Sequence, residues 1–142
     1  MKSLFSTSWN AAQANFWLLI IRIAVCGFML THGVPKFTKL VGAADIKFAD
    51  PFGVGQTFSF ILVVFAEFVC SIFIAMGFAT RLASLVLFIT MAVAAFHAHA
   101  NDPFATKEKA LLYLLIYLAL MVFGAGRFSV DNMIAGGGKR RR

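Results

Sequence analysis

Charged residues are scarce in this sequence. Asp, Glu, Lys and Arg make up 13% of the 142 residues, whereas hydrophobic residues make up 61% and the mean hydropathy is +0.85. This composition excludes an ordinary soluble domain and is typical of a protein that lies in lipid. The three prolines form no Pro-rich linker, and no polar stretch is long enough to fold separately. We therefore expect one membrane domain.

Cysteine is also rare, and the familiar sequence motifs of enzymes are missing. The two cysteines, Cys26 and Cys70, belong neither to a Cys-x-x-Cys motif nor to a haem-attachment motif. The sequence has no Gly-rich phosphate loop, no serine-protease-like triad and no pair of catalytic carboxylates. Because a buried cysteine is usually inert packing, catalytic thiol chemistry is only a minor alternative.

Four apolar stretches fill most of the chain. About twenty apolar residues cross a hydrocarbon layer of ~30 Å as a helix, and an isolated strand would leave its backbone unpaired in lipid. We therefore predict an all-α membrane protein, a four-helix transmembrane bundle, with spans at residues 16–37, 54–78, 81–99 and 108–124. Residues 1–135 are expected to form this single domain.

The positive charge is concentrated at the C-terminus. Four of the cations behind the net charge of +7 follow one another at positions 139–142, after three glycines, so residues 136–142 are expected to be a flexible basic tail, either native or left from expression. Lipid headgroups, rather than nucleic acid, are its expected partner. With the tail, the terminal side carries seven Lys and Arg (three plus four) against five on the other side, which predicts cytoplasmic termini. Without the tail the count is three against five.

Three polar side chains are expected at one level near the outer ends of the spans. By helix rise, His32, His97 and Glu108 each come out roughly 24 Å above the cytoplasmic ends. Lys36 follows one turn beyond His32 on the same face. Histidine beside a carboxylate suits proton exchange near neutral pH, so these four residues are the predicted catalytic set. The alternatives are interfacial hydrogen bonding without chemistry and, less favoured, a haem or a metal; we predict no metal site.

A second polar level is expected deeper in the bundle. By helix rise, Arg22 comes out at roughly 9 Å, and Glu67 and Tyr113 at roughly 16 Å. Charges at such depth are costly and need partners, so Arg22 and Glu67 are expected to pair, with Tyr113 or Tyr117 completing the hydrogen bonds. This pair is either a structural ion pair or part of a cofactor-binding set of Arg22, Glu67 and Tyr113. In a third reading Arg22 extends alone to the cytoplasmic surface.

Several short strings follow one another in order along nearly the whole chain. They are Arg22, Gly27, His32–Gly33 and Lys36–Phe37 in the first span, Glu67 in the second, residues 77–81 (Gly-Phe-Ala-Thr-Arg) at the next turn, His97 with Glu108, and residues 124–131 (Gly-Ala-Gly-Arg-Phe-Ser-Val-Asp) after the last span. Together these strings make the sequence similar to the DoxX family of small bacterial membrane proteins. One difference is Ala125, which stands where a proline is often found.

The resemblance implies a multi-pass protein of the bacterial inner membrane and favours quinone-linked electron transfer, because the family takes its name from a subunit of a thiosulfate:quinone oxidoreductase. In that role His32, His97 or Lys36 would donate hydrogen bonds to a quinone, and Glu108 or Glu67 would pass protons. The electron donor would come from a redox partner subunit. The competing hypothesis is a non-catalytic assembly or structural subunit, so enzymatic activity stays open. Small-solute transport is less favoured, because four spans enclose little volume unless the chain forms a homo-oligomer.

Overall fold

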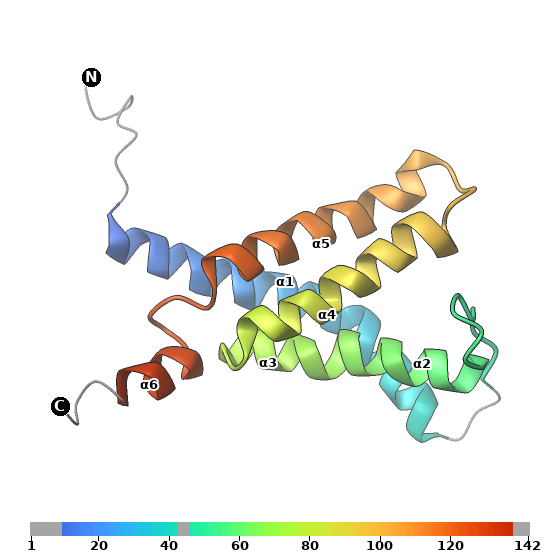
Figure 1. Ribbon diagram of the computed structural model, residues 1–142, viewed down its shortest axis with the longest axis horizontal. Coiled ribbons are helices and arrows are strands. Elements are labelled where there is room, and N and C mark those ends of the chain that lie inside the picture. Colours follow the sequence, from blue (N-terminus) through green and yellow to red (C-terminus); the bar gives the residue numbers. More distant parts are fainter. Residues whose placement is uncertain (1–9, 43–45, 138–142) are drawn as a thin grey trace.

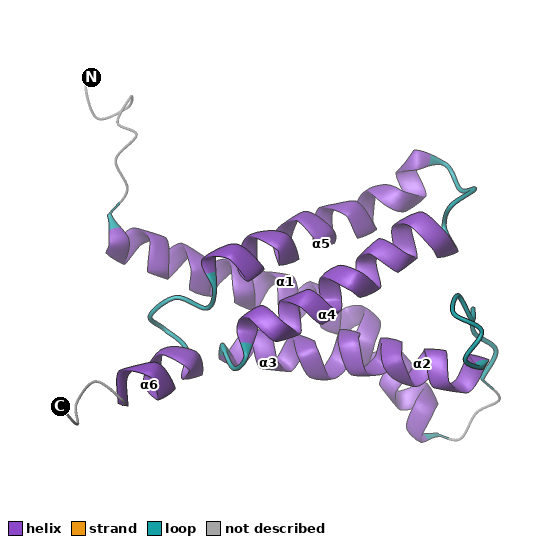
Figure 2. Cartoon of the chain, viewed as in Figure 1, coloured by secondary structure: helices purple, strands orange, loops and turns teal. Residues whose placement is uncertain are grey.

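The computed structural model describes residues 10–42 and 46–137, which contain helices and no strand. The described residues form five continuous helices (Figures 1 and 2), and two of these contain a π-helical segment, written η. The helices are α1 (Ala11–Val41), α2 (Gln56–Val64) continued by η2 (Phe65–Cys70) and α3 (Ser71–Met76), α4 (Thr80–Val93) continued by η3 (Ala94–Ala98), α5 (Phe104–Phe123) and α6 (Val130–Gly137).

The first four helices run back and forth along the long direction of the molecule (Figure 1). The start of α1, the end of α3, the end of α5 and all of α6 lie at one end, which we call the terminal end. The opposite end, which carries the loops before α2 and α5, is the far end. α4 and α5 form the most extensive helix pair.

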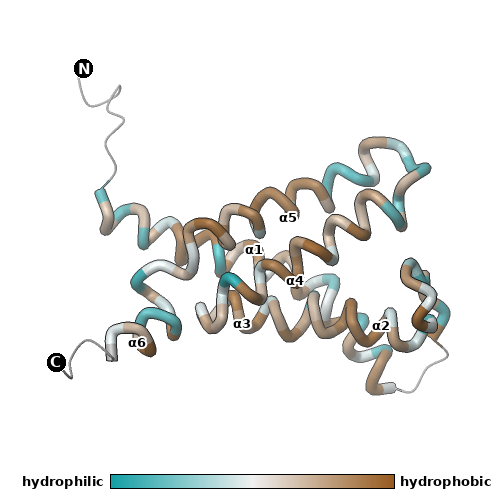
Figure 3. Tube along the Cα trace, viewed as in Figure 1, coloured by the Kyte–Doolittle hydropathy of each residue, from teal (hydrophilic) through white to brown (hydrophobic). Residues whose placement is uncertain are grey.

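Within the described part of the chain, three helices are long and apolar enough to cross a membrane: Ala11–Val41, Gln56–Met76 and Thr80–Ala98. The prediction of an all-α membrane protein is confirmed. The fourth helix, α5, differs because three charged residues at 107–109 follow its first residues, and Figure 3 shows this hydrophilic start. The uncharged part, residues 110–123, spans only ~21 Å, less than a hydrocarbon layer of ~30 Å.

Helix α1 is longer than predicted at both ends. It begins at Ala11, where Asn10 accepts a hydrogen bond from the backbone N–H of Ala12 at 2.9 Å, and it continues through Pro35 to Val41. Its 31 residues measure ~46 Å at the standard rise, which exceeds the hydrocarbon thickness. The helix must therefore tilt or project from the bilayer. The short helix α6 was not predicted, and it takes in the first residues of the expected basic tail; residues 138–142 lie outside the described part.

The core lies where the four long helices face one another, and large apolar side chains such as Phe28 and Leu115 cover the outside. This arrangement suits a bundle surrounded by lipid, so the helices contact the bilayer. Gly33 sets the closest approach within it. A Cβ at Gly33 would lie 2.6 Å from the carbonyl oxygen of Glu67, so only a residue without a side chain lets α1 pack this closely on η2.

Candidate functional site

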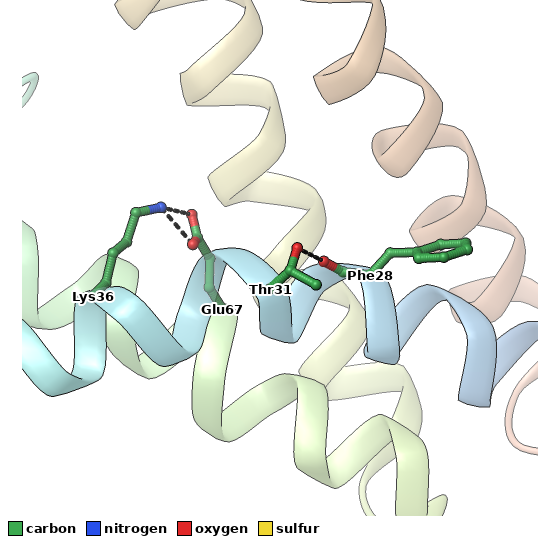
Figure 4. Close-up of polar contacts among 4 residues, drawn as sticks. All are labelled: Phe28, Thr31, Lys36 and Glu67. Atoms are coloured by element: carbon green, nitrogen blue, oxygen red, sulfur yellow. Dashed lines mark hydrogen bonds and ion pairs between the residues drawn. The ribbon is translucent and has the colours of Figure 1, made fainter.

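The buried carboxylate of Glu67 binds Lys36, not Arg22. The Lys36 Nζ donates to Glu67 Oε1 at 2.6 Å and to Oε2 at 2.5 Å, and Figure 4 shows the two side chains pointing toward one another from α1 and η2. The Glu67 side chain is 7% exposed and that of Lys36 is 30% exposed, so the pair lies at the margin of the core. The predicted pairing of Arg22 with Glu67 is therefore wrong.

The register of α1 against η2 explains this change of partner. The close contact at Gly33 places the backbone of Glu67 beside α1 one turn before Lys36. Helix rise alone predicts that Glu67 lies well below Lys36, because the calculation takes every span to start at the same height in the bilayer. α1 in fact starts five residues before the predicted span, and Glu67 lies in a π-helical segment. Such segments occur often at functional sites.

Arg22 has a structural partner at the terminal end. Its side chain is fully buried, and Nη2 donates to the backbone carbonyl of Phe128 at 2.6 Å. Nε and Nη1 have no hydrogen-bond partner among the described residues, and the carboxylate of Asp131 is within electrostatic reach. A side chain at Gly77, whose φ is +71°, would collide with Nη1 and with Ser129. Arg22 therefore ties α1 to the loop after α5.

Asp131 completes this terminal clasp, by which we mean Arg22, Gly77, Phe128 and Asp131. Its carboxylate accepts the backbone N–H of Ala79 at 2.7 Å and of Thr80 at 3.0 Å, and its own N–H donates to the carbonyl of Gly77 at 2.8 Å. Ala79 has a φ of +46°, which is unusual for a residue with a side chain. The carboxylate thus caps the start of α4 and holds a strained turn.

His32 lies beside Tyr113 in a shallow hollow between α1 and α5. The two rings meet edge to face, with centroids 6.5 Å apart, and the Tyr113 ring stacks on Tyr117 at 6.2 Å. The hollow measures about 350 Å³. We call it the His32 hollow; it is lined by Phe28, Thr31, His32, Lys109, Leu112, Tyr113 and Ile116.

Tyr113 connects this hollow with the ion pair. The carboxylate of Glu67 is within electrostatic reach of the phenols of both Tyr113 and Tyr117. Tyr117 is fully buried, and its hydroxyl lies beside that of Ser71 without reaching hydrogen-bonding geometry. The described residues thus form a polar group at the α1–η2–α5 junction, with the buried acid on one side and the histidine on the other.

His97 and Glu108 do not line the His32 hollow. Both are exposed, His97 in η3 and Glu108 in the second turn of α5. The expected convergence of His32, His97 and Glu108 at one site is therefore not seen among the described residues. His99 binds Asp102 at 2.6 Å in the loop before α5. The chemical roles predicted for His97 and Glu108 stay predictions.

Sequence reasoning missed Phe28, Thr31 and Lys109 in the lining of the hollow. Lys109 precedes Tyr113 by four residues, so the two share one face of α5, and that spacing was the available signal. The Thr31 hydroxyl donates to the Phe28 carbonyl within α1, as Figure 4 shows. Both Cys26 and Cys70 are buried free thiols. Within residues 10–42 and 46–137, no cluster of three or more His, Cys, Asp and Glu side chains is arranged to hold a metal.

Comparison with known proteins identifies the family. Residues 17–100 match the DoxX family, which covers more than half of the chain. The chain is also 31% identical over 124 residues to a protein of Haemophilus influenzae described as uncharacterized, covering 82% of this chain and 90% of that protein. No solved structure matches it.

Proposed function

Because this chain belongs to the DoxX family of membrane proteins, we propose that it is the quinone-facing membrane subunit of an oxidoreductase complex. The observation that carries the proposal is the contact of His32 with Tyr113 in a hollow whose remaining wall is mostly apolar. Two polar rings that meet at the edge of a bundle provide hydrogen-bond donors where a lipid-soluble ligand can arrive.

The His32 hollow fits a quinone in size and in chemistry. Its volume of about 350 Å³ falls within the range of about 300 to 1,000 Å³ typical of small-molecule sites. Phe28 and Leu112 are 64% and 55% exposed on its rim, so the hollow opens toward the lipid. His32, Tyr113 and Lys109 supply N–H and O–H donors for carbonyl oxygens. A bound quinone supplies two-electron, two-proton acceptor chemistry.

In this proposal the ion pair serves proton transfer. Lys36 pairs with the carboxylate of Glu67, and Tyr113, which lines the hollow, is within electrostatic reach of that carboxylate. His97 and Glu108 keep their predicted role of exchanging protons with the medium at the far end. Arg22 leaves the predicted cofactor-binding set, because its guanidinium belongs to the terminal clasp. The electron donor is assigned to a redox partner subunit.

The proposed location is the bacterial inner membrane with both termini in the cytoplasm. The start of α1 and α6 lie at the same end of the bundle, as an even number of crossings requires (Figure 1). The orientation rests on the positive-inside count, to which the tail cations contribute most.

A second candidate function is a non-catalytic assembly subunit. Both cations that lie within α1 favour this function, because each makes a contact that can be purely structural. Lys36 pairs with Glu67, and Arg22 donates to the Phe128 carbonyl. In that case the buried charges fix helix register, and the His32 hollow has no ligand.

Equilibrium binding of decylubiquinone to the purified protein in nanodiscs separates the two functions. Replacing His32→Leu or Tyr113→Phe should weaken binding by about five- to tenfold, the value of one lost hydrogen bond. His99→Leu is the matched control, because His99 pairs with Asp102 in the loop before α5 and does not line the hollow. Saturable binding that depends on His32 supports the quinone-facing subunit. Absence of saturable binding in a folded wild-type protein supports the assembly subunit.

A further inference from the structure

A second and larger hollow lies at the terminal end, between the start of α4, the end of α5 and α6. It measures about 520 Å³. We call it the Arg81 hollow; the residues of its lining that matter here are Thr80, Arg81, Leu82, Phe123, Asp131 and Asn132. None of them belongs to the His32 hollow, and the proposed function assigns the space no role.

Arg81 supplies this hollow with unused hydrogen-bond donors. A guanidinium has five N–H donors, and Arg81 makes one side-chain bond among the described residues, from Nη2 to the carbonyl of Val122 at 3.3 Å. Arg81 forms no ion pair with the carboxylates of the described residues. Its guanidinium lies against Gly124, where a Cβ would be 3.4 Å from Nε. The end of α5 therefore positions the cation and leaves most of its donors available.

The polar groups around Arg81 favour an anion. The acidic residue in the lining, Asp131, already accepts two backbone N–H groups, from Ala79 and Thr80. The N–H groups of the Arg81 guanidinium that are unpaired among the described residues match the oxygens of a phosphate.

Apolar side chains flank these polar groups. Leu82 and Phe123 line the hollow and are 64% and 69% exposed, one at the start of α4 and the other at the end of α5. The ends of membrane-spanning helices lie at the depth of lipid headgroups. A ligand with a phosphate and hydrocarbon chains would satisfy both kinds of surface at once.

We propose that the Arg81 hollow binds the phosphate of an anionic phospholipid. Arg81 donates to the phosphate oxygens, Asn132 adds a polar contact, and Leu82 and Phe123 contact the first part of the acyl chains. An isolated arginine at a helix end would instead attract every anionic headgroup weakly. The proposal therefore predicts a preference that depends on this arginine and not on positive charge in general.

Native mass spectrometry of the detergent-purified protein, equilibrated in turn with phosphatidylglycerol, phosphatidylethanolamine and phosphatidylcholine, tests this proposal. The wild-type protein should retain phosphatidylglycerol about fivefold more than phosphatidylcholine, as expected for about 1 kcal/mol per cation near a headgroup. Arg81→Gln should abolish the preference, and Arg81→Lys should keep part of it because the charge remains but the planar fork is lost. Arg127→Gln is the charge-matched control, because Arg127 is exposed in the loop between α5 and α6, at the same end of the bundle, and does not line the hollow.

The proposal would be overturned if Arg81→Gln and Arg127→Gln lost the preference for phosphatidylglycerol equally, or if the wild-type protein showed no lipid preference. Displacement of phosphatidylglycerol by millimolar inorganic phosphate would assign the hollow to a soluble anion and would also overturn it. If Arg81→Gln fails to fold, Arg81→Lys provides the test. A preference for phosphatidylglycerol in that variant equal to that of the wild type would contradict a bidentate contact between Arg81 and the phosphate. Neither result bears on quinone binding at the opposite end of the bundle.

Discussion

Lys36 binds both carboxylate oxygens of Glu67 across the contact between α1 and η2. This ion pair joins two helices at the point where Gly33 brings their backbones together, so packing and electrostatics depend on one another there. The Glu67 carboxylate is also within electrostatic reach of Tyr113, which lines the His32 hollow. Both the stability and the proposed proton transfer of the protein should depend on this contact.

Replacing one partner of the Lys36–Glu67 pair should lower the free energy of unfolding more than expected from the effect of replacing both. Lys36→Met leaves a carboxylate that is 7% exposed without its cation, and Glu67→Gln leaves the ammonium without its acid. Each single variant should lose on the order of 3 kcal/mol of unfolding free energy, and the double variant clearly less than the sum. Reversible unfolding in mixed micelles gives the unfolding free energy of the wild type, the two single variants and the double variant. Strict additivity of the two single effects would contradict a direct pair.

A methyl group at Gly33 should separate α1 from η2. Gly33→Ala places a carbon 2.6 Å from the Glu67 carbonyl oxygen, and relief of this overlap should cost about 1 to 3 kcal/mol. Gly27→Ala is the matched control on the same helix, because a Cβ there meets nothing within 4 Å. Thermal unfolding of both variants in detergent is the measurement. A Gly33→Ala protein as stable as Gly27→Ala would show that the helices do not pack this closely.

The helical class and the alternating course of the helices could be predicted because both follow from hydropathy and from the need to pair every backbone group in lipid. Helix register could not be predicted in this way. It depends on the contact at Gly33, on two π-helical segments and on an α1 that extends beyond its apolar stretch, none of which changes the average hydropathy of a span. The prediction that the fourth helix crosses the whole hydrocarbon layer was too generous, because the apolar part of α5 is short.

The terminal clasp should stabilise the protein through a helix cap. Asp131→Ala removes the acceptor of two backbone N–H groups at the start of α4 and should cost about 1 to 2 kcal/mol. Asp102→Ala serves as the control, since Asp102 is exposed and binds only the side chain of His99. Unfolding midpoints in detergent provide the comparison. Equal shifts in the two variants would mean that the cap contributes nothing specific.

The turn before α2 should lose order in acid. The hydrogen bond from the Ser59 hydroxyl, with further bonds from Gly55 and Val54, holds the pKa of Asp50 below its usual value. A lowered folded-state pKa means that the stabilisation is present above the unfolded pKa of about 3.9 and is lost as the pH falls through the folded value.

Hydrogen exchange of the Val54 and Gly55 amides, corrected for the intrinsic pH dependence, should therefore show protection at about pH 6 that disappears below about pH 3. Asp50→Asn should remove this pH dependence, and Ser59→Ala should move the loss of protection to higher pH. Protection that is independent of pH in the wild-type protein would contradict the role given to Asp50.

The candidate site was only partly predictable from sequence. His32, Lys36, Glu67 and Tyr113 were singled out because polar residues in apolar helices need partners, and the structure brings them together at one junction. The choice of partners required the three-dimensional register. Lys36, not Arg22, is the partner of Glu67, and the side chains of His97 and Glu108 lie outside the hollow. Estimates of depth from helix rise cannot predict either result, because they ignore the direction in which a side chain points around the helix axis.

The most direct test of the quinone-facing role is photolabelling with an azido-quinone in nanodiscs, followed by peptide mapping. The label should appear in residues 28–32 of α1 and residues 109–116 of α5, which together line the His32 hollow. Excess decylubiquinone should prevent this labelling, and His32→Leu should reduce it. Labelling spread evenly over the lipid-facing helices and insensitive to competitor would contradict a quinone site in this protein.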